Sequence, residues 1–464
     1  MQWIKFNILW LFLSAYIIFA LCVIAIFDGT GDSGDSILHF LFAESAPQHP
    51  ELYFNHWAKP VFTLLASPFA QFGFVGMKVF NALVVLPTLF FTCQATLNWN
   101  VKRPVFVLLF IACAPLLIRH TFSGLTEPLF ALFIAWGMYL VSKNKWLFAC
   151  IVISFLPFVR SEGLIVMTSF GLLLLVRKQW KFIPWLLVGH VVYSLAGWFH
   201  YKDILWVFTK IPYASTTSIY GKGDLLHFVD QLPFVIGVPA VLFLAVGTIS
   251  LLIKLIQRQF HPELHALVLY GFLSYFIAHS LFWYLGIFNS MGLNRVLLGV
   301  MPFIAVICAI GVNSLLDLVR YPKIQIGLAA VFGIVVLTFP VWDNPSSVHW
   351  KRDMNLSGEQ QAARKAALFA KNIDQPGRYL YLPPYVSMVL DVDHFDNNKR
   401  SDINPLIIQK AESGDVIIWD NWFSVVDAHV TQEMIEESGA FQKLRTVKGM
   451  QEDREVIYIV YQAK

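Results

Sequence analysis

The stretch that decides the fold begins with an apolar run, FNILWLFLSAYIIFALCVIAIF at residues 6–27, and continues into DGTGDSGDSILHFLFAESAPQHPELYFNHWAKP at residues 28–60. The first run is long enough to cross a bilayer, which takes about 20 apolar residues. The second segment carries carboxylates, histidines and a lysine, which cannot face lipid without partners. The sequence therefore predicts a membrane scaffold that holds a polar loop, residues 28–60, outside the hydrocarbon.

The composition separates a membrane part from a water-soluble part. The chain has 464 residues, of which 57% are hydrophobic and only 14% are charged, and this excludes an ordinary soluble protein. Residues 1–342 contain 12 acidic and 20 basic residues, a net charge of +8, whereas residues 343–464 contain 18 acidic and 14 basic residues, a net charge of −4. We therefore expect a transmembrane domain at 1–342, with its first outer loop at 28–60, and a soluble domain at 343–464.

Apolar runs predict about eleven transmembrane helices. They are residues 6–27, 76–97, 104–119, 125–142, 146–160, 162–176, 182–199, 233–253, 265–285, 295–314 and 324–341. Residues 60–74 are also apolar, but the run is short and contains two prolines and a glycine. We expect that segment to be re-entrant or to lie along the interface.

The charged residues predict the orientation. With the N-terminus inside, 12 of the 20 basic residues of the membrane part fall on loops predicted to be cytoplasmic. Ten of its 12 acidic residues fall on the outer side, which places a polar site there. The expected location is a bacterial inner membrane, crossed many times, with the site and the C-terminal domain on the extracytoplasmic face.

The soluble part reads as a small α/β domain. Ser357-Gly358-Glu359-Gln360 resembles a capping box that opens a helix to about residue 372. Strands are expected at 378–382, 414–419, 441–447 and 455–461, and a second helix from about Thr431 to Gly439.

The polar loop contains two candidate groups for chemistry. Asp32 and Asp35 are three residues apart and would share a face if helical, which is close enough for each to shift the other's pKa. An ordinary solvated turn explains them equally well. His56 and Lys59 offer cationic or hydrogen-bonding groups just before Pro60, suited to an anion, although an anchor beside lipid headgroups is an equal alternative.

Three further charges lie at span boundaries. Glu127 starts one predicted span, and Arg160 and Glu162 lie between two others. Charges this close to hydrocarbon are costly and are usually paired or functional. A structural pair between Arg160 and either glutamate is slightly favoured over a direct role in catalysis. His190 and His279 lie within apolar runs and are interpreted as hydrogen-bonded core histidines.

The order of these motifs resembles that of the GT-C membrane glycosyltransferases, which take sugars from polyprenyl-phosphate carriers at the outer membrane face. The motifs are Gly34-Asp35-Ser36, His56 to Pro60, Thr126-Glu127-Pro128, Arg160-Ser161-Glu162-Gly163 and Asn294-Arg295, followed by a soluble C-terminal domain. The resemblance implies an all-α polytopic membrane fold with a small C-terminal α/β extracytoplasmic domain. It also implies a hexosyltransferase of the inverting type, similar to mannosyltransferases and protein O-mannosyltransferases.

The resemblance also implies roles for individual residues. Asp35, with Asp32 beside it, would be the general base that activates an acceptor hydroxyl. The carrier phosphate would be bound by a set of basic residues, and two glutamates would contact substrate. The phosphate-binding set is Lys59, His56, Arg295 and Arg160, and the substrate-binding pair is Glu127 and Glu162.

Asp35 is preferred to Asp32 as the base because it stands where the glycine-rich turn meets an apolar run. We expect burial there to raise its pKa and to hold it rigidly, whereas Asp32, between Gly31 and Ser33, should be more mobile. We further expect Lys59 and Arg295 to converge near one phosphate although they are distant in sequence.

The expected partners are a polyprenyl-phosphate-linked sugar donor, an acceptor of unknown class and the lipid bilayer, with no nucleic acid. No Walker loop or dinucleotide fingerprint occurs, so no cofactor is expected. Since Ser36 follows Asp35 where one common family pattern has a second acid, no metal is expected. Two alternatives remain open: a lipid-linked glycan ligase or polymerase, and a lipid-sugar transporter or flippase. A transporter would favour broken helices at the midplane and an internal repeat.

Overall fold

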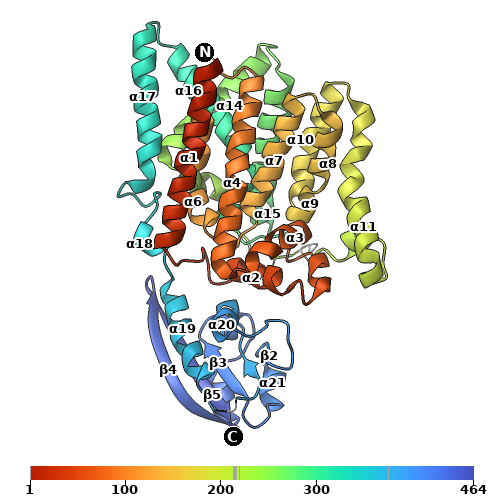
Figure 1. Ribbon diagram of the computed structural model, residues 1–464, viewed down its shortest axis with the longest axis vertical. Coiled ribbons are helices and arrows are strands. Elements are labelled where there is room, and N and C mark those ends of the chain that lie inside the picture. Colours follow the sequence, from red (N-terminus) through yellow and green to blue (C-terminus); the bar gives the residue numbers. More distant parts are fainter. Residues whose placement is uncertain (1, 213–216, 219, 375) are drawn as a thin grey trace.

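The computed structural model describes residues 2–212, 217–218, 220–374 and 376–464. A bundle of helices forms one part, and a smaller α/β part is attached to one end of it (Figure 1). The N-terminus lies at the far end of the bundle, so the two chain termini are at opposite ends of the molecule. The predicted division at residue 342 falls between η5 (Phe339–Val341) and α18 (Trp350–Asp353).

The predicted apolar runs form the helices of the bundle. In chain order these helices are α1 (Gln2–Ile26), α4 (Gly73–Asn98), α5 (Val105–Ala112), α6 (Pro115–Thr121), α7 (Glu127–Ser142), α8 (Trp146–Ser154), α9 (Leu156–Val159), α10 (Gly163–Val176), η2 with α11 (Trp180–Leu187 and Val188–Tyr201), α12 (Trp206–Thr209), α13 (His227–Ile236), α14 (Val238–Ile256), η3 with α15 (Glu263–Leu269 and Tyr270–Leu285), η4 with α16 (Asn294–Val300 and Met301–Asp317) and α17 (Pro322–Thr338). Among the described residues, seven helices are long and apolar enough to cross a membrane. The prediction of a polytopic, mainly helical membrane protein is confirmed.

Some predicted spans are interrupted. The run at 104–119 divides into α5 and α6 at Pro115, which has no N–H for the helical hydrogen-bond ladder and crowds the preceding turn. The run at 146–160 likewise divides into α8 and α9. Those pieces and α10 are shorter than the seven long helices. The α16 helix lies in the centre of the bundle, and its apolar window is wholly buried.

The first polar loop folds across the end of the bundle that faces the C-terminal part (Figure 1). It contains α2 (Asp35–Ser45) and η1 (Pro50–Phe54), and α3 (Pro60–Ala70) begins at its last residue. Eleven residues of helix extend only about 16 Å, so α3 is too short to cross a bilayer. It packs against α2 and α4 instead, and the expectation that residues 60–74 are re-entrant or lie along the interface stays a prediction.

The C-terminal part is a mixed sheet with helices, as predicted. The sheet order is β2-β1-β3-β5-β4. The strands are β1 (Tyr379–Leu380), β2 (Arg400–Ser401), β3 (Val416–Asp420), β4 (Phe441–Gln451) and β5 (Arg454–Ala463). The first three are parallel, and β5 is antiparallel to both β3 and β4. The two-residue strand β2 carries too little pattern to be predicted.

Helices complete this part. The predicted capping box is present at the start of α19 (Gly358–Lys371), which packs on β4 and β5. The helix expected from Thr431 is α23 (Gln432–Glu437). Four short helices among the described residues of this part were not predicted: α18, α20 (Pro384–Leu390), α21 (Pro405–Gln409) and α22 (Phe423–Val426). The α20 helix contacts α2, so this part rests directly on the first loop.

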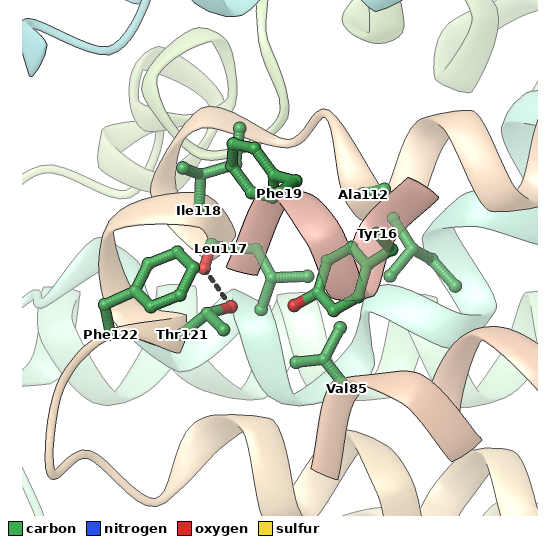
Figure 2. A pocket seen from close by; sticks show the side chains of 9 residues that line it. Tyr16, Phe19, Val85, Ala112, Leu117, Ile118, Thr121 and Phe122 are labelled. Atoms are coloured by element: carbon green, nitrogen blue, oxygen red, sulfur yellow. Dashed lines mark hydrogen bonds between the residues drawn. The ribbon is translucent and has the colours of Figure 1, made fainter. Parts of the chain in front are cut away.

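A small cavity lies between α1, α4, α5 and α6 (Figure 2). Its lining includes Tyr16, Phe19, Val85 and Thr121, and the Thr121 hydroxyl donates to the Leu117 carbonyl. The lining is mainly apolar and contains no charged side chain. The cavity therefore belongs to the core of the bundle, and the candidate site lies elsewhere.

Candidate active site

Arg295, near the start of η4, joins the two aspartates of the first loop. Its Nη1 lies 2.8 Å from Asp32 Oδ2, and its Nη2 donates to Asp35 Oδ2. The guanidinium is mostly buried, with 14% of the side chain exposed. The planar fork of an arginine suits two carboxylates at once, and here each arm takes one. Residues more than 250 positions apart thus meet at the bundle end.

The two aspartates are held differently. Asp32 Oδ1 accepts the backbone N–H groups of Gly34 and Ser36, at 3.0 and 2.8 Å, and so stabilises the N-terminus of α2. Asp35 is the first residue of α2, and its side chain is 44% exposed against 31% for Asp32. Sequence reasoning expected Asp32 to be the more mobile of the two, and that expectation stays a prediction. Backbone donors anchor Asp32, a contact that flanking Gly and Ser residues do not reveal.

The pKa of Asp35 was expected to be raised, and this direction was wrong. Burial acts to raise the pKa of its carboxyl, but the attraction of Arg295, with smaller help from Arg160, outweighs burial, and the pKa is lowered. The pKa of Asp32 is raised, because burial there outweighs Arg295. Asp35 is therefore ionised at neutral pH in this structure, and its carboxylate is occupied by a guanidinium.

A second ion-pair group continues from Arg295 into the bundle. Glu127 is fully buried at the start of α7, with Oε1 2.7 Å from Arg160 Nη1 and 3.5 Å from Arg295 Nε. Arg160 also donates to Glu162 at 2.9 Å and to the Thr126 hydroxyl at 3.0 Å. Both of the pairs considered from sequence, Arg160 with Glu127 and Arg160 with Glu162, are present. The cluster is therefore one connected network from Asp35 to Glu162.

Lys59 lies beside this network. It is buried just before α3, within electrostatic range of Asp35, Glu127, Arg160 and Glu162. Burial lowers the pKa of its ammonium to about 8. Three of the groups that influence Lys59, namely Asp35, Glu127 and Arg160, also influence Arg295. The convergence of Lys59 and Arg295 on one phosphate stays a prediction.

His56 lies next to Lys59 but does not carry a charge at neutral pH. Its ring packs 4.9 Å from that of Trp206, and burial, with the nearby Lys59 charge, lowers its pKa to about 4. The interpretation of His56 as a possible cation is therefore corrected. At neutral pH it can act only as a neutral hydrogen-bonding group.

Sequence reasoning missed other groups at the site. His39 faces Asp35 from the next turn of α2, its ring stacked 4.8 Å from Trp57, and burial lowers its pKa to about 3. The i,i+4 spacing of Asp35 and His39 on a helix could have suggested this pair. Tyr275 and His279, on α15, lie within electrostatic range of Arg160 and Glu162. His279 was interpreted as an ordinary core histidine, and no local signal placed it here.

The acidic groups of the cluster each contact a guanidinium. Within the described ranges, no group of three or more His, Cys, Asp and Glu side chains could hold a metal ion. The arrangement instead combines carboxylates, one of them half-exposed, with three cations at a bundle end. The carboxylates of this site can accept a proton, and the neighbouring cations can stabilise an anion.

The helical bundle and the α/β part at one end of it together form an ArnT-like fold. Two solved structures share this fold over nearly the whole chain. ArnT from Cupriavidus metallidurans bound to undecaprenyl phosphate has a TM-score of 0.61 and 13% identity, covering 97% of each chain. The apo state of the same protein has a TM-score of 0.57 and 11% identity, covering 96% of this chain and 97% of that one. No protein-family model and no curated protein sequence matches.

Proposed function

We propose that this chain is an integral membrane glycosyltransferase. It moves a sugar from a polyprenyl-phosphate carrier to an acceptor hydroxyl at the outer face of the membrane. The observation that carries the proposal is the joining of Asp35 and Asp32 to Arg295 beside Lys59, at one end of a GT-C-type bundle. A protein of the same fold, ArnT from Cupriavidus metallidurans, has been crystallised with undecaprenyl phosphate.

The cations serve the carrier phosphate. A polyprenyl-phosphate sugar is a phosphodiester, and its phosphate gains charge as the bond to the sugar breaks. Lys59 and Arg295 are both influenced by Arg160, Asp35 and Glu127, which supports a joint action of the three cations on one such group, and His56 would add a neutral hydrogen bond. Cations that already stand where charge develops lower the barrier, because they need no rearrangement during the reaction.

Asp35 serves as the base. The acceptor hydroxyl attacks the anomeric carbon of the sugar, its proton passes to the Asp35 carboxylate, and the carbon–oxygen bond to the phosphate breaks. The lipid phosphate leaves with the bonding electrons. A single displacement of this kind inverts the anomeric centre. Asp35 suits this role better than Asp32, because its carboxylate is the more exposed and makes no hydrogen bond to the turn backbone.

Arg295 links the two halves of the site. In this structure its charge lowers the pKa of Asp35, which weakens that carboxylate as a base. When the carrier phosphate accepts hydrogen bonds from the Arg295 guanidinium, Arg295 stabilises the Asp35 carboxylate less. The pKa of Asp35 then rises. Donor binding thus strengthens the base at the moment it is needed.

The remaining carboxylates hold the cations and the sugar. Asp32 orients Arg295, and Glu127 keeps both arginines in place from inside the bundle. Glu162 is the more exposed of the two glutamates and would contact the sugar hydroxyls, whereas the fully buried Glu127 would act on the substrate through the arginines that it holds. The sugar is a hexose, with mannose the first to test, and the acceptor class is left to the assay. The site and the C-terminal domain face the extracytoplasmic side of a bacterial inner membrane.

The test is transfer from lipid-linked sugars in detergent or liposomes. Asp35→Asn keeps the size of the side chain but removes its basicity, so turnover should fall by about 10²-fold or more while donor binding is retained. Asp32→Asn should cost less. Glu51→Gln, at a half-exposed carboxylate of the same loop, is the matched control and should transfer normally. Near-normal turnover in Asp35→Asn would remove Asp35 from the chemistry.

Lys59→Ala tests the phosphate site separately. It should raise the KM for the donor and reduce the amount of polyprenyl phosphate that co-purifies, as measured by mass spectrometry. Unchanged donor binding in Lys59→Ala would exclude the proposed phosphate site.

A further inference from the structure

The start of α19, in the C-terminal part, reaches the turn that carries Asp32. The contact is made by Gln360, which is 2% exposed. Its Oε1 accepts the backbone N–H of Ser357 at 3.1 Å, and this bond forms one half of the capping box. Its Nε2 donates to the Thr30 hydroxyl oxygen at 2.5 Å and to the Asp32 backbone carbonyl at 3.2 Å. One carboxamide therefore caps its own helix and holds the loop.

The buried hydroxyl oxygen of Thr30 needs a hydrogen-bond donor from a neighbouring side chain. A hydroxyl has one proton and two lone pairs, and the Thr30 proton is already used on the Asp32 carbonyl at 2.8 Å. Thr30 is buried, so its lone pairs need a donor from the protein. The Gln360 amide supplies this donor. A glutamate would cap the helix equally well, but its carboxylate has no proton to donate to the Thr30 oxygen or to the Asp32 carbonyl, and it could only compete with that carbonyl for the Thr30 proton.

The membrane bundle holds the same turn from the opposite side. The Ser36 hydroxyl donates to the Thr30 carbonyl at 2.5 Å and accepts the Gly124 N–H at 2.7 Å. Ser36 and Gly124 are both buried. The turn from Thr30 to Ser36 is thus fixed between the loop before α7 and the start of α19.

Neighbouring contacts extend the same attachment. The Ser33 hydroxyl donates to Glu359 at 3.2 Å, and the Gly29 N–H donates to the Met354 carbonyl at 2.9 Å. The Leu356 N–H donates to Asp28 at 3.1 Å. Contacts with the segment 354–360 therefore cover residues 28–33, and they end where the aspartates face Arg295.

We propose that Gln360 is a positioning residue, and that the C-terminal part holds the Asp32–Asp35 turn in its reactive geometry through it. The role in catalysis rests on the function proposed above, whereas the contact itself does not. The C-terminal part is accordingly a structural half of the site, required for turnover even where it does not touch the donor.

The critical variant is Gln360→Glu, which keeps the capping acceptor and removes the donor. Two readouts are used: hydrogen exchange of the peptide spanning residues 28–36 in the full-length protein, and transfer kinetics with a lipid-linked sugar. Exchange of this peptide should rise, and kcat should fall about tenfold or more, since small misplacements of reacting groups are costly. The KM for the donor should change less than kcat, because Arg160 of the phosphate-binding set is held by Glu127 and Glu162, which lie outside this turn.

Two comparisons separate positioning from general loss of structure. Ser357→Ala removes the cap hydroxyl, which accepts the Gln360 N–H, but leaves the Gln360 side chain in place. It should lower the melting temperature at least as much as Gln360→Glu while leaving kcat and exchange of residues 28–36 near wild type. Thr30→Val should reproduce the Gln360→Glu effects, and Thr30→Ser, which keeps the hydroxyl, should restore them.

The outcomes are distinguishable. Unchanged exchange in Gln360→Glu would overturn the contact, and raised exchange with unchanged kcat would overturn the positioning role. A larger kcat loss in Ser357→Ala than in Gln360→Glu would also overturn it. If wild-type protein transfers no sugar from any lipid-linked donor while Gln360→Glu still raises exchange, the proposed function fails and the attachment of the loop stands.

Discussion

Replacing Gly124 with alanine should move the catalytic turn by a calculable distance. A Cβ built on Gly124 would lie 2.1 Å from the Ser36 carbonyl oxygen, whereas real Cβ atoms essentially never approach an atom closer than 3.0 Å. Ser36 must therefore shift by about 0.9 Å, the difference between these distances, or Gly124 must withdraw by as much. Withdrawal would lengthen the bond from the Gly124 N–H to the Ser36 hydroxyl, now 2.7 Å.

The shift falls on the residue next to the proposed base. A displacement of about 1 Å can cost about 10²-fold in rate, which corresponds to about 2.7 kcal/mol of activation free energy. The expected loss of stability is comparable, about 1–3 kcal/mol for inserting a methyl group into a packed region. Gly124→Ala should therefore lower kcat by about 10²-fold in protein that remains folded.

The assay compares two glycine substitutions in purified protein. Transfer rates are normalised to the folded fraction at the assay temperature, taken from melting curves in detergent. Gly171→Ala on α10 is the control, because a Cβ there meets no atom within 4 Å. It should keep full activity. Wild-type kcat in Gly124→Ala, or an equal loss in Gly171→Ala, would refute the argument that this contact sets the position of the turn.

Three further predictions concern charge and topology. The pKa of Lys59 is lowered to about 8, so its cation is lost as the pH rises through 8, and the donor KM should then rise by up to about tenfold per pH unit; in Lys59→Arg the KM should stay flat over this range, because a guanidinium remains charged. Arg160→Met removes the 2.7 Å partner of the fully buried Glu127 and should destabilise the protein by about 3–5 kcal/mol, seen as a lower melting temperature, whereas the same change at the exposed Lys102–Asp317 pair should cost under about 1 kcal/mol. A reporter active only in the cytoplasm should be silent when fused at Lys464 and active when inserted at Asn144 between α7 and α8; a strong signal at Lys464 would reverse the orientation.

The fold could be predicted because apolar run length is a strong physical constraint in a membrane. Each long run became a helix, and the charges at run boundaries, such as Glu127 and Arg160, converged on one cluster because isolated charges there are too costly. Where a predicted run divided, as at Pro115, its position was predicted correctly, but it forms two helices instead of one. Length and hydropathy report where a helix lies, and they report breaks less well.

The charge state of the site could not be predicted, because it depends on which cation reaches which carboxylate. Partial burial of Asp35 was anticipated, and burial alone would have raised its pKa. Arg295, 260 positions later, reverses the sign by donating directly to it. A difference of one ångström in that contact changes the balance between desolvation and attraction, and sequence spacing holds no information on that scale.

The role inferred for Gln360 was hidden for a different reason. The capping box explained this residue completely at the local level, so nothing remained to prompt a second function. A capping box accepts either Glu or Gln at its third helical position, and helix formation does not distinguish them. Only the tertiary structure does, because the amide nitrogen of Gln360 donates to the Thr30 hydroxyl oxygen and to the Asp32 carbonyl, which a carboxylate cannot do. At such a position the local role accepts two residue types and the tertiary contacts accept only one. This difference indicates that the residue has a second function.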